Sequence, residues 1–241
     1  MRLIGIDLSW KTENNPSALA VGRMVDGTLQ VEHIETGLQS VESILTAIRS
    51  RDEVIGIAID APLIIENHNG QRACEKAVGR DYGGRKASCH TSNKSRYPDS
   101  LSVHLSSLLQ KSGFQHLNGD QWQIECYPHP AIIECFGLSE RLAYKKGRVC
   151  EKKSGQAKLA KLIGFLEYSK ILPLKLLGNL KVSFSDSEIN ELQGKELKRN
   201  EDALDSVICL YIAGLYHEKI ASTLYGDSIH GYIWIPQIKC I

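Results

Sequence analysis

Two short apolar runs, each closed by an aspartate, constrain the fold of this chain more than any other feature. Residues 2–8 (RLIGIDL) place Asp7 near the end of one run, and residues 54–60 (VIGIAID) end at Asp60. The second run is apolar on both faces, which is typical of a central strand that runs parallel to its neighbour. If the first run is that neighbour, both carboxylates emerge at one edge of the sheet, where open α/β sheets bind ligands.

The residues between these runs predict two further strands and a helix. Residues 18–25 and 28–34 are strand-like, and Asp26-Gly27 between them is a strong two-residue hairpin signal. A turn is expected at Asn14, Asn15 and Pro16, and Ser40 is suited to cap a helix. The predicted order is strand, strand, strand, helix, strand, opening with an antiparallel meander.

The rest of the chain is predominantly helical. We expect a fifth strand at 121–127 and a final strand at 229–235. The 241 residues suit one domain, with a basic insert near residues 70–112. The fold class is therefore α/β, with a mixed five-stranded sheet in βββαβ order and flanking helices, expected at 70–80, 99–112, 131–136, 156–170, 186–197 and 201–217.

Composition excludes several classes. Hydrophobic residues make up 42% of the chain and charged residues 24%, as in globular proteins. The formal net charge of +1 does not indicate a globally basic nucleic-acid binder. The sequence contains no run of eighteen apolar residues, so no membrane-spanning helix is expected. The first ten residues do not resemble a secretory signal. Seven scattered cysteines without a CxxC pair indicate reduced thiols, and hence a cytoplasmic protein.

Three further acids lie in apolar surroundings. Asp202 and Asp205 are three residues apart, which places them on one helical face. Asp205 is flanked by Leu204 and Val207, so its charge is costly to bury unless it is paired or bound to a metal. Glu125 lies in the predicted fifth strand, where it needs a partner unless strand alternation points it at solvent.

Together these acids suggest a hard metal site. Carboxylates with few histidines suit Mg²⁺ or Mn²⁺ better than zinc. Two such ions about 4 Å apart could activate water and stabilise the leaving oxygen of a phosphodiester. The candidate catalytic residues are Asp7, Asp60, Glu125, Asp202 and Asp205, and the candidate metal ligands are the four aspartates among them.

A basic stretch follows the second aspartate strand. Its arginines and lysines are candidates for holding phosphates, and its tyrosines for stacking on unpaired bases. An ordinary solvated loop explains the same pattern, and a solvated face explains the lysines of residues 145–161. His129 suits either proton transfer or a hydrogen bond to a turn. The candidate substrate-binding residues are Arg72, Arg80, Arg85, Lys86 and Arg96.

Several short motifs, in this order, resemble a widespread uncharacterised family of predicted ribonuclease-H-like nucleases. They are GIDLSW, IAIDAPL, IECYPHPAI, EDALDSVICLYIAGL and GYIWIP. The resemblance spans most of the chain and implies a ribonuclease-H-like fold with nuclease chemistry. The resemblance implies that the family's catalytic acids correspond to the five candidate catalytic residues.

The main hypothesis is therefore a metal-dependent nuclease that uses two metal ions. Asp7 would bridge the ions, Asp60 and Asp205 would each hold one, and Asp202 and Glu125 would complete the shells. Nucleic acid is the expected partner, with DNA or RNA undecided and the oligomeric state unknown. Two alternatives remain, an ATP-dependent phosphotransferase of actin-like fold and a non-catalytic nucleic-acid or protein binding module. The actin-like kinases need a Gly-Thr-type phosphate turn after the first aspartate, whereas Leu8-Ser9-Trp10 follows Asp7.

Overall fold

A computed structural model describes residues 1–11 and 15–241, so the turn predicted at Asn14 lies outside the described residues. The strands are β1 Arg2–Asp7, β2 Ser17–Val25, β3 Thr28–Leu38, β4 Val54–Asp60, β5 Gln115–His116, β6 Trp122–Glu125, β7 Leu174–Leu176, β8 Ser222–Asp227 and β9 Gly231–Pro236. The helices are α1 Val41–Arg49, α2 Ala73–Tyr82, α3 Leu101–Lys111, α4 Pro128–Phe136, α5 Val149–Phe165, α6 Leu180–Ser183, α7 Asp186–Glu191 and α8 Gly194–His217, with short 3₁₀ turns at Gly83–Arg85 and Leu166–Tyr168.

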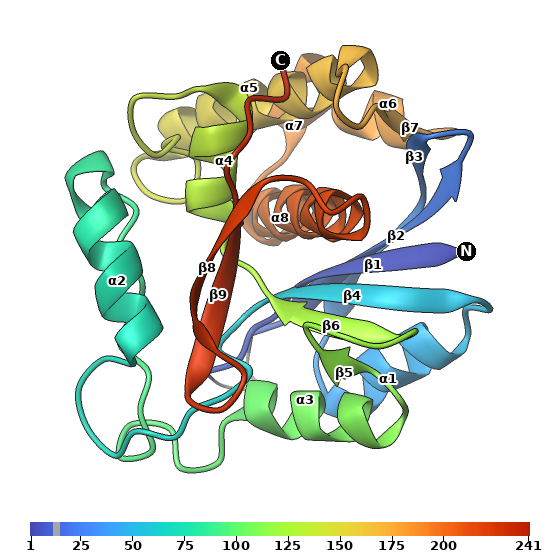
Figure 1. Ribbon diagram of the computed structural model, residues 1–241. Coiled ribbons are helices and arrows are strands. Elements are labelled where there is room, and N and C mark those ends of the chain that lie inside the picture. Colours follow the sequence, from blue (N-terminus) through green and yellow to red (C-terminus); the bar gives the residue numbers. More distant parts are fainter. Residues whose placement is uncertain (12–14) are drawn as a thin grey trace.

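The central sheet has the order β5-β6-β4-β1-β2-β3-β7 (Figure 1). β2 is antiparallel to both β1 and β3, whereas β4 is parallel to β1 and β6 is parallel to β4. The predicted ribonuclease-H-like mixed sheet and its βββαβ order are therefore confirmed. β5 and β7 extend the five predicted strands at the two edges, and at two and three residues they are too short to show a period of two.

Strand alternation divides the core between two faces of the sheet. Ile4, Ile6, Ile57 and Ile59 pack with α1 and α3 on one face. Ala58 and its neighbours pack with α8 on the other face. Asp7 and Asp60 alternate with the isoleucines, so their side chains leave the sheet on the α8 face.

Helix α8 lies directly on β1 because Gly5 has no side chain. A Cβ at Gly5 would lie 1.9 Å from the backbone nitrogen of Leu210 and 2.3 Å from the carbonyl oxygen of Ser206. This close approach buries α8 between the sheet and the elements that cover it (Figure 1). It also sets Asp205, one residue before Ser206, next to the end of β1.

The last predicted strand forms part of a separate hairpin. β9 pairs with β8 in a two-stranded sheet that lies beside α8 in Figure 1. Trp234 of β9 bridges Cys126 after β6, and the Tyr232 hydroxyl donates to the carbonyl oxygen of Gln123 at 3.1 Å. α2 packs against this hairpin, whereas α3 packs beneath the sheet, so the two helices of the predicted 70–112 insert lie in different places.

Three predicted helices have clearly different bounds, and the one expected over 201–217 already begins at Gly194. α5 begins at Val149 rather than at residue 156, because its first turns are lysine-rich and exposed and show no apolar period. The helix predicted over 186–197 ends at Glu191, and α8 begins at Gly194. Within the described residues, no helix combines the length and apolarity needed to cross a membrane.

Candidate active site

Asp7 and Asp60 occupy matching positions at the carboxyl ends of two neighbouring parallel strands. The register of β1 and β4 pairs Ile6 with Ile59 and Asp7 with Asp60. Asp202 and Asp205 of α8 approach from above, close enough for both to influence the charge of Asp7. The structure thus brings together the four aspartates of the predicted metal set.

Each of the two helical aspartates has a lysine partner. The Lys145 ammonium lies 2.7 Å from Oδ2 of Asp205, and the Tyr144 hydroxyl donates to Oδ1 of the same carboxylate at 2.6 Å. Lys198 lies 2.7 Å from Oδ1 of Asp202 and 2.6 Å from Glu201. Because Asp205 is fully buried, its two partners offset the cost of removing the charge from water.

The two strand aspartates are buried close to other carboxylates. Burial, reinforced by Asp205, raises the pKa of Asp7 well above its usual range, although Lys145 opposes the rise. Burial also raises the pKa of Asp60 to about 7, again against the influence of Lys145. Both carboxylates are therefore harder to ionise than a free aspartate, and a further cation nearby would favour their ionised forms.

The chemistry of this donor set fits Mg²⁺ or Mn²⁺, because it consists of carboxylate oxygens. The carboxylates are farther apart than the ligands of an assembled metal site. Across residues 1–11 and 15–241, no group of three or more His, Cys, Asp or Glu side chains stands close enough to hold one metal ion. Asp7, Asp60 and the second oxygen of Asp202 are the ligands that a cation entering the cleft would meet, since Tyr144 and Lys145 engage Asp205.

Glu125 belongs to the other face of the sheet. It pairs in register with Ile59, which packs against α1 and α3, whereas Asp60 leaves on the α8 face. Its Oε2 accepts hydrogen bonds from the Leu63 backbone N–H at 2.9 Å and from Arg72 at 2.8 Å, and its Oε1 accepts a second bond from Arg72 at 2.5 Å. These partners give Glu125 a structural role in the described chain.

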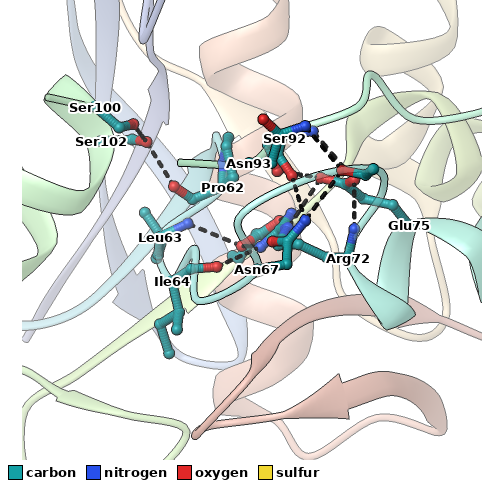
Figure 2. A network of polar contacts seen from close by, with 12 residues as sticks. Pro62, Leu63, Ile64, Asn67, Arg72, Glu75, Ser92, Asn93, Ser100 and Ser102 are labelled. Atoms are coloured by element: carbon teal, nitrogen blue, oxygen red, sulfur yellow. Dashed lines mark hydrogen bonds and ion pairs between the residues drawn. The ribbon is translucent and has the colours of Figure 1, made fainter. Parts of the chain in front are cut away.

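Arg72 forms the centre of this buried network, part of which Figure 2 shows. Its Nε donates to Glu75 at 2.9 Å and its Nη1 to the carbonyl oxygen of Ile64 at 3.0 Å. Glu75 also accepts hydrogen bonds from the backbone N–H and the hydroxyl of Ser92. The guanidinium is thus used inside the protein, which leaves Arg72 no free face for a phosphate.

The other predicted substrate-binding residues are scattered. Arg80 is exposed beside Asp81, Arg85 lies 2.5 Å from Glu134, and Lys86 lies 2.6 Å from Glu140. Arg96 is exposed and close enough to Lys11 to help lower its pKa, after the larger effect of burial. Among the five candidates, Arg96 is the one linked to a cleft-lining cation, Lys11, although it does not itself line the cleft.

A cleft of about 480 Å³ opens above the aspartates. Asp7, Asp60 and Asp202 line it, with Asp205 behind them. Its walls are basic and aromatic, formed by Trp10, Lys11, His90, Tyr127, His129, Arg141, Tyr144, Lys145, Lys146 and Lys198. Sequence reasoning did not select Lys145, Lys198 or Arg141, although Lys198 precedes Asp202 by four residues, a spacing that predicts contact on a helix.

His129 contributes a buried imidazole to the same cleft. It lies at the start of α4, with its ring beside Tyr127 and Tyr144. Burial, together with Lys145 and Arg141, lowers the pKa of His129 well below its usual range. Its Nδ1 is buried and has no hydrogen-bond partner within the described chain, although the residue lines the cleft.

Fold and site together define the class of the protein. The mixed sheet contains the strand order β6-β4-β1-β2-β3, and aspartates end β1 and β4. Two more aspartates lie on α8, which covers the sheet. These features are those of a ribonuclease-H-like protein with a carboxylate cluster. The chain belongs to the family described as Protein of unknown function (DUF429), whose model matches residues 5–229.

No curated protein matches the sequence. A crystal structure of the Fowlpox virus resolvase in complex with substrate Holliday junction DNA aligns with 91% of this chain and 97% of that chain. The two share 10% sequence identity, with a TM-score of 0.36.

Proposed function

We propose that this protein is a metal-dependent nuclease that hydrolyses phosphodiester bonds of nucleic acid. One observation carries the proposal. Three aspartates from β1, β4 and α8 form the floor of a cleft whose walls are basic and aromatic. Such a floor attracts a divalent cation, and such walls attract a polyanion that carries flat bases.

The cation would be held by Asp7 and Asp60, with Asp202 beside them. Mg²⁺ or Mn²⁺ would supply Lewis-acid chemistry there, activating water and offsetting charge on the phosphate oxygens. The raised pKa values of Asp7 and Asp60 support this assignment, because carboxylates that are buried, and also lie near other carboxylates, gain most from a bound cation.

The walls suit the other parts of a nucleic-acid strand. Lys11, Arg141 and Lys146 offer positive charge to phosphates without crowding the floor. The rings of Trp10 and Tyr127 offer surfaces for unpaired bases. His129, whose pKa burial lowers well below its usual range, adds a neutral ring to the lining of the cleft.

Cleavage assays test the proposal. Single-stranded, duplex and hybrid DNA and RNA would be incubated with the full chain and Mg²⁺ or Mn²⁺, beside Asp7→Asn and Asp186→Asn. Asp186 is an exposed acid in the first turn of α7, so its change controls for loss of a carboxylate. We expect metal-dependent cleavage that Asp7→Asn abolishes and Asp186→Asn preserves. The absence of cleavage on every substrate would refute the proposal, and retained metal binding in that case would favour phosphotransfer.

A further inference from the structure

The segment between α4 and α5 places a fixed positive charge beside the aspartates. Tyr144 and Lys145 are neighbours in this segment, and together they engage both oxygens of Asp205, at 2.6 Å and 2.7 Å. A metal ion that used Asp205 would have to displace one of them. The Asp205 carboxylate is therefore held by a hydrogen bond on Oδ1 and by an ion pair on Oδ2, which has no hydrogen-bond partner among the described residues.

Packing holds this segment in place. Tyr144 is fully buried, and its ring lies against His129. A Cβ at Gly155 of α5 would lie 2.0 Å from the carbonyl oxygen of Ala143 and 2.6 Å from the Cα of Tyr144. The α5 backbone thus rests directly on the segment, and moving Lys145 away by a rigid shift would break this contact.

Lys145 nevertheless faces the cleft. About 29% of its side chain is exposed, and the residue lines the cavity above Asp7 and Asp60. Its ammonium influences the charge of both strand aspartates. It is therefore anchored by Asp205 on one side and open to a ligand in the cleft on the other.

The balance of charges then favours one metal ion. Lys145 pairs with Asp205 and Lys198 with Asp202, whereas the ion pairs of the described chain do not include Asp7 or Asp60. The two strand aspartates together carry two negative charges when ionised. A single divalent cation balances them.

We propose that Lys145 takes the place of a second metal ion, so that the site binds one divalent cation and uses the lysine as its other positive charge. This inference rests on the proposed nuclease function and departs from the two ions predicted from the sequence. In the reaction, the oxygen of water bonds to phosphorus, the ester P–O bond breaks, and a proton passes to the leaving oxygen. Lys145 stays protonated throughout and stabilises charge on a phosphate oxygen.

Metal stoichiometry tests the inference independently of activity. Mn²⁺ binding to the full chain would be followed by isothermal titration calorimetry and by electron paramagnetic resonance of the free ion. We expect one ion per chain in the wild type and in Lys145→Arg, which keeps the charge. We expect two in Lys145→Met, because the freed Asp205 carboxylate becomes a ligand. Lys158→Met, an exposed lysine of α5, is the matched control and should bind one.

Cleavage provides the second measurement. Lys145→Met should lose about 10²–10³-fold in rate, the usual effect of removing one preorganised charge partner, while Lys158→Met keeps the wild-type rate. Two ions in the wild type, or one ion with unchanged affinity in Lys145→Met, would overturn the inference and leave the nuclease proposal standing. If no variant binds metal or cleaves, the proposed function itself fails. Should Lys145→Met not fold, the wild-type stoichiometry alone decides.

Discussion

Replacing Arg72 by methionine should destabilise the protein severely. The side chain of Arg72 is 2% exposed, and it donates three hydrogen bonds to the buried carboxylates of Glu75 and Glu125. Its loss leaves two buried acids without their cation, which typically costs about 3–5 kcal/mol. For a chain of this size, each kcal/mol corresponds to roughly 2–4 °C, so we expect the melting temperature to fall by about 6–20 °C.

The loss should depend on pH in a defined direction. Burial raises the pKa of Glu125 while Arg72 opposes the rise, so removing Arg72 raises it further. An acid whose pKa is raised by folding destabilises the protein as the pH climbs above its unfolded pKa, and not below it. The deficit should therefore shrink between pH 7 and pH 5, by up to about 1.4 kcal/mol per pH unit.

Urea denaturation at both pH values provides the measurement. Arg80→Met is the control, because Arg80 is 76% exposed beside Asp81 and its removal should change stability by no more than about 0.5 kcal/mol. The double variant Arg72→Met with Glu125→Leu should recover part of the loss, since apolar groups can replace a buried pair. A deficit below about 1 kcal/mol, or one that does not vary with pH, would refute the structural role given to this pair.

Three further outcomes are expected. Gly5→Ala should cost at least about 1–3 kcal/mol in urea denaturation, because its Cβ would meet the α8 backbone; Gly79→Ala in α2, where the Cβ meets nothing within 4 Å, should be neutral or stabilising. Asp60→Asn, melted in chelator, should gain stability relative to the wild type as the pH rises from 5 to 7, by up to about 3 kcal/mol, and should gain little more between pH 7 and 8. Over that range the unfolded chain is already ionised at Asp60, whereas the folded wild type must give up its proton at a pKa of about 7. A gain independent of pH would contradict this. Mg²⁺ at a hundred times its Kd should stabilise the wild type by about 2.7 kcal/mol, and an equal stabilisation of Asp7→Asn would exclude Asp7 as a ligand.

The central fold was predictable because its signals are local. Asp26 and Gly27 adopt the positive φ angles, 47° and 72°, that a tight hairpin requires, and Ser40 caps α1 as expected. The edge strands were missed because two or three residues carry no periodicity. β8 was missed because five of its six residues are at least partly exposed, and its pairing with β9 depends on α2 and α4 packing around it.

The site was predictable only where strand ends and helix spacing determined it. Asp7, Asp60, Asp202 and Asp205 converge as expected, while their role as metal ligands stays a prediction. Glu125 was grouped with them because an acid inside a core strand needs a partner, although the alternation with Ile124, in the α8-side core, places it on the opposite face. Arg72 pairs with Glu125, 53 positions away, and Asp205 with Tyr144 and Lys145, about 60 positions away, and no local pattern reveals such distant pairs.

The burial of α8 against β1 determines when the aspartate cluster can assemble during synthesis on the ribosome. Asp7 and Asp60 leave the exit tunnel early, but Asp202 and Asp205 belong to the last fifth of the chain, and β9, which packs beside α8, follows them. A nascent chain that ends before α8 presents two unopposed strand aspartates and an open sheet face. The proposed hydrolytic site therefore cannot assemble until α8 has been synthesised and has packed on the sheet.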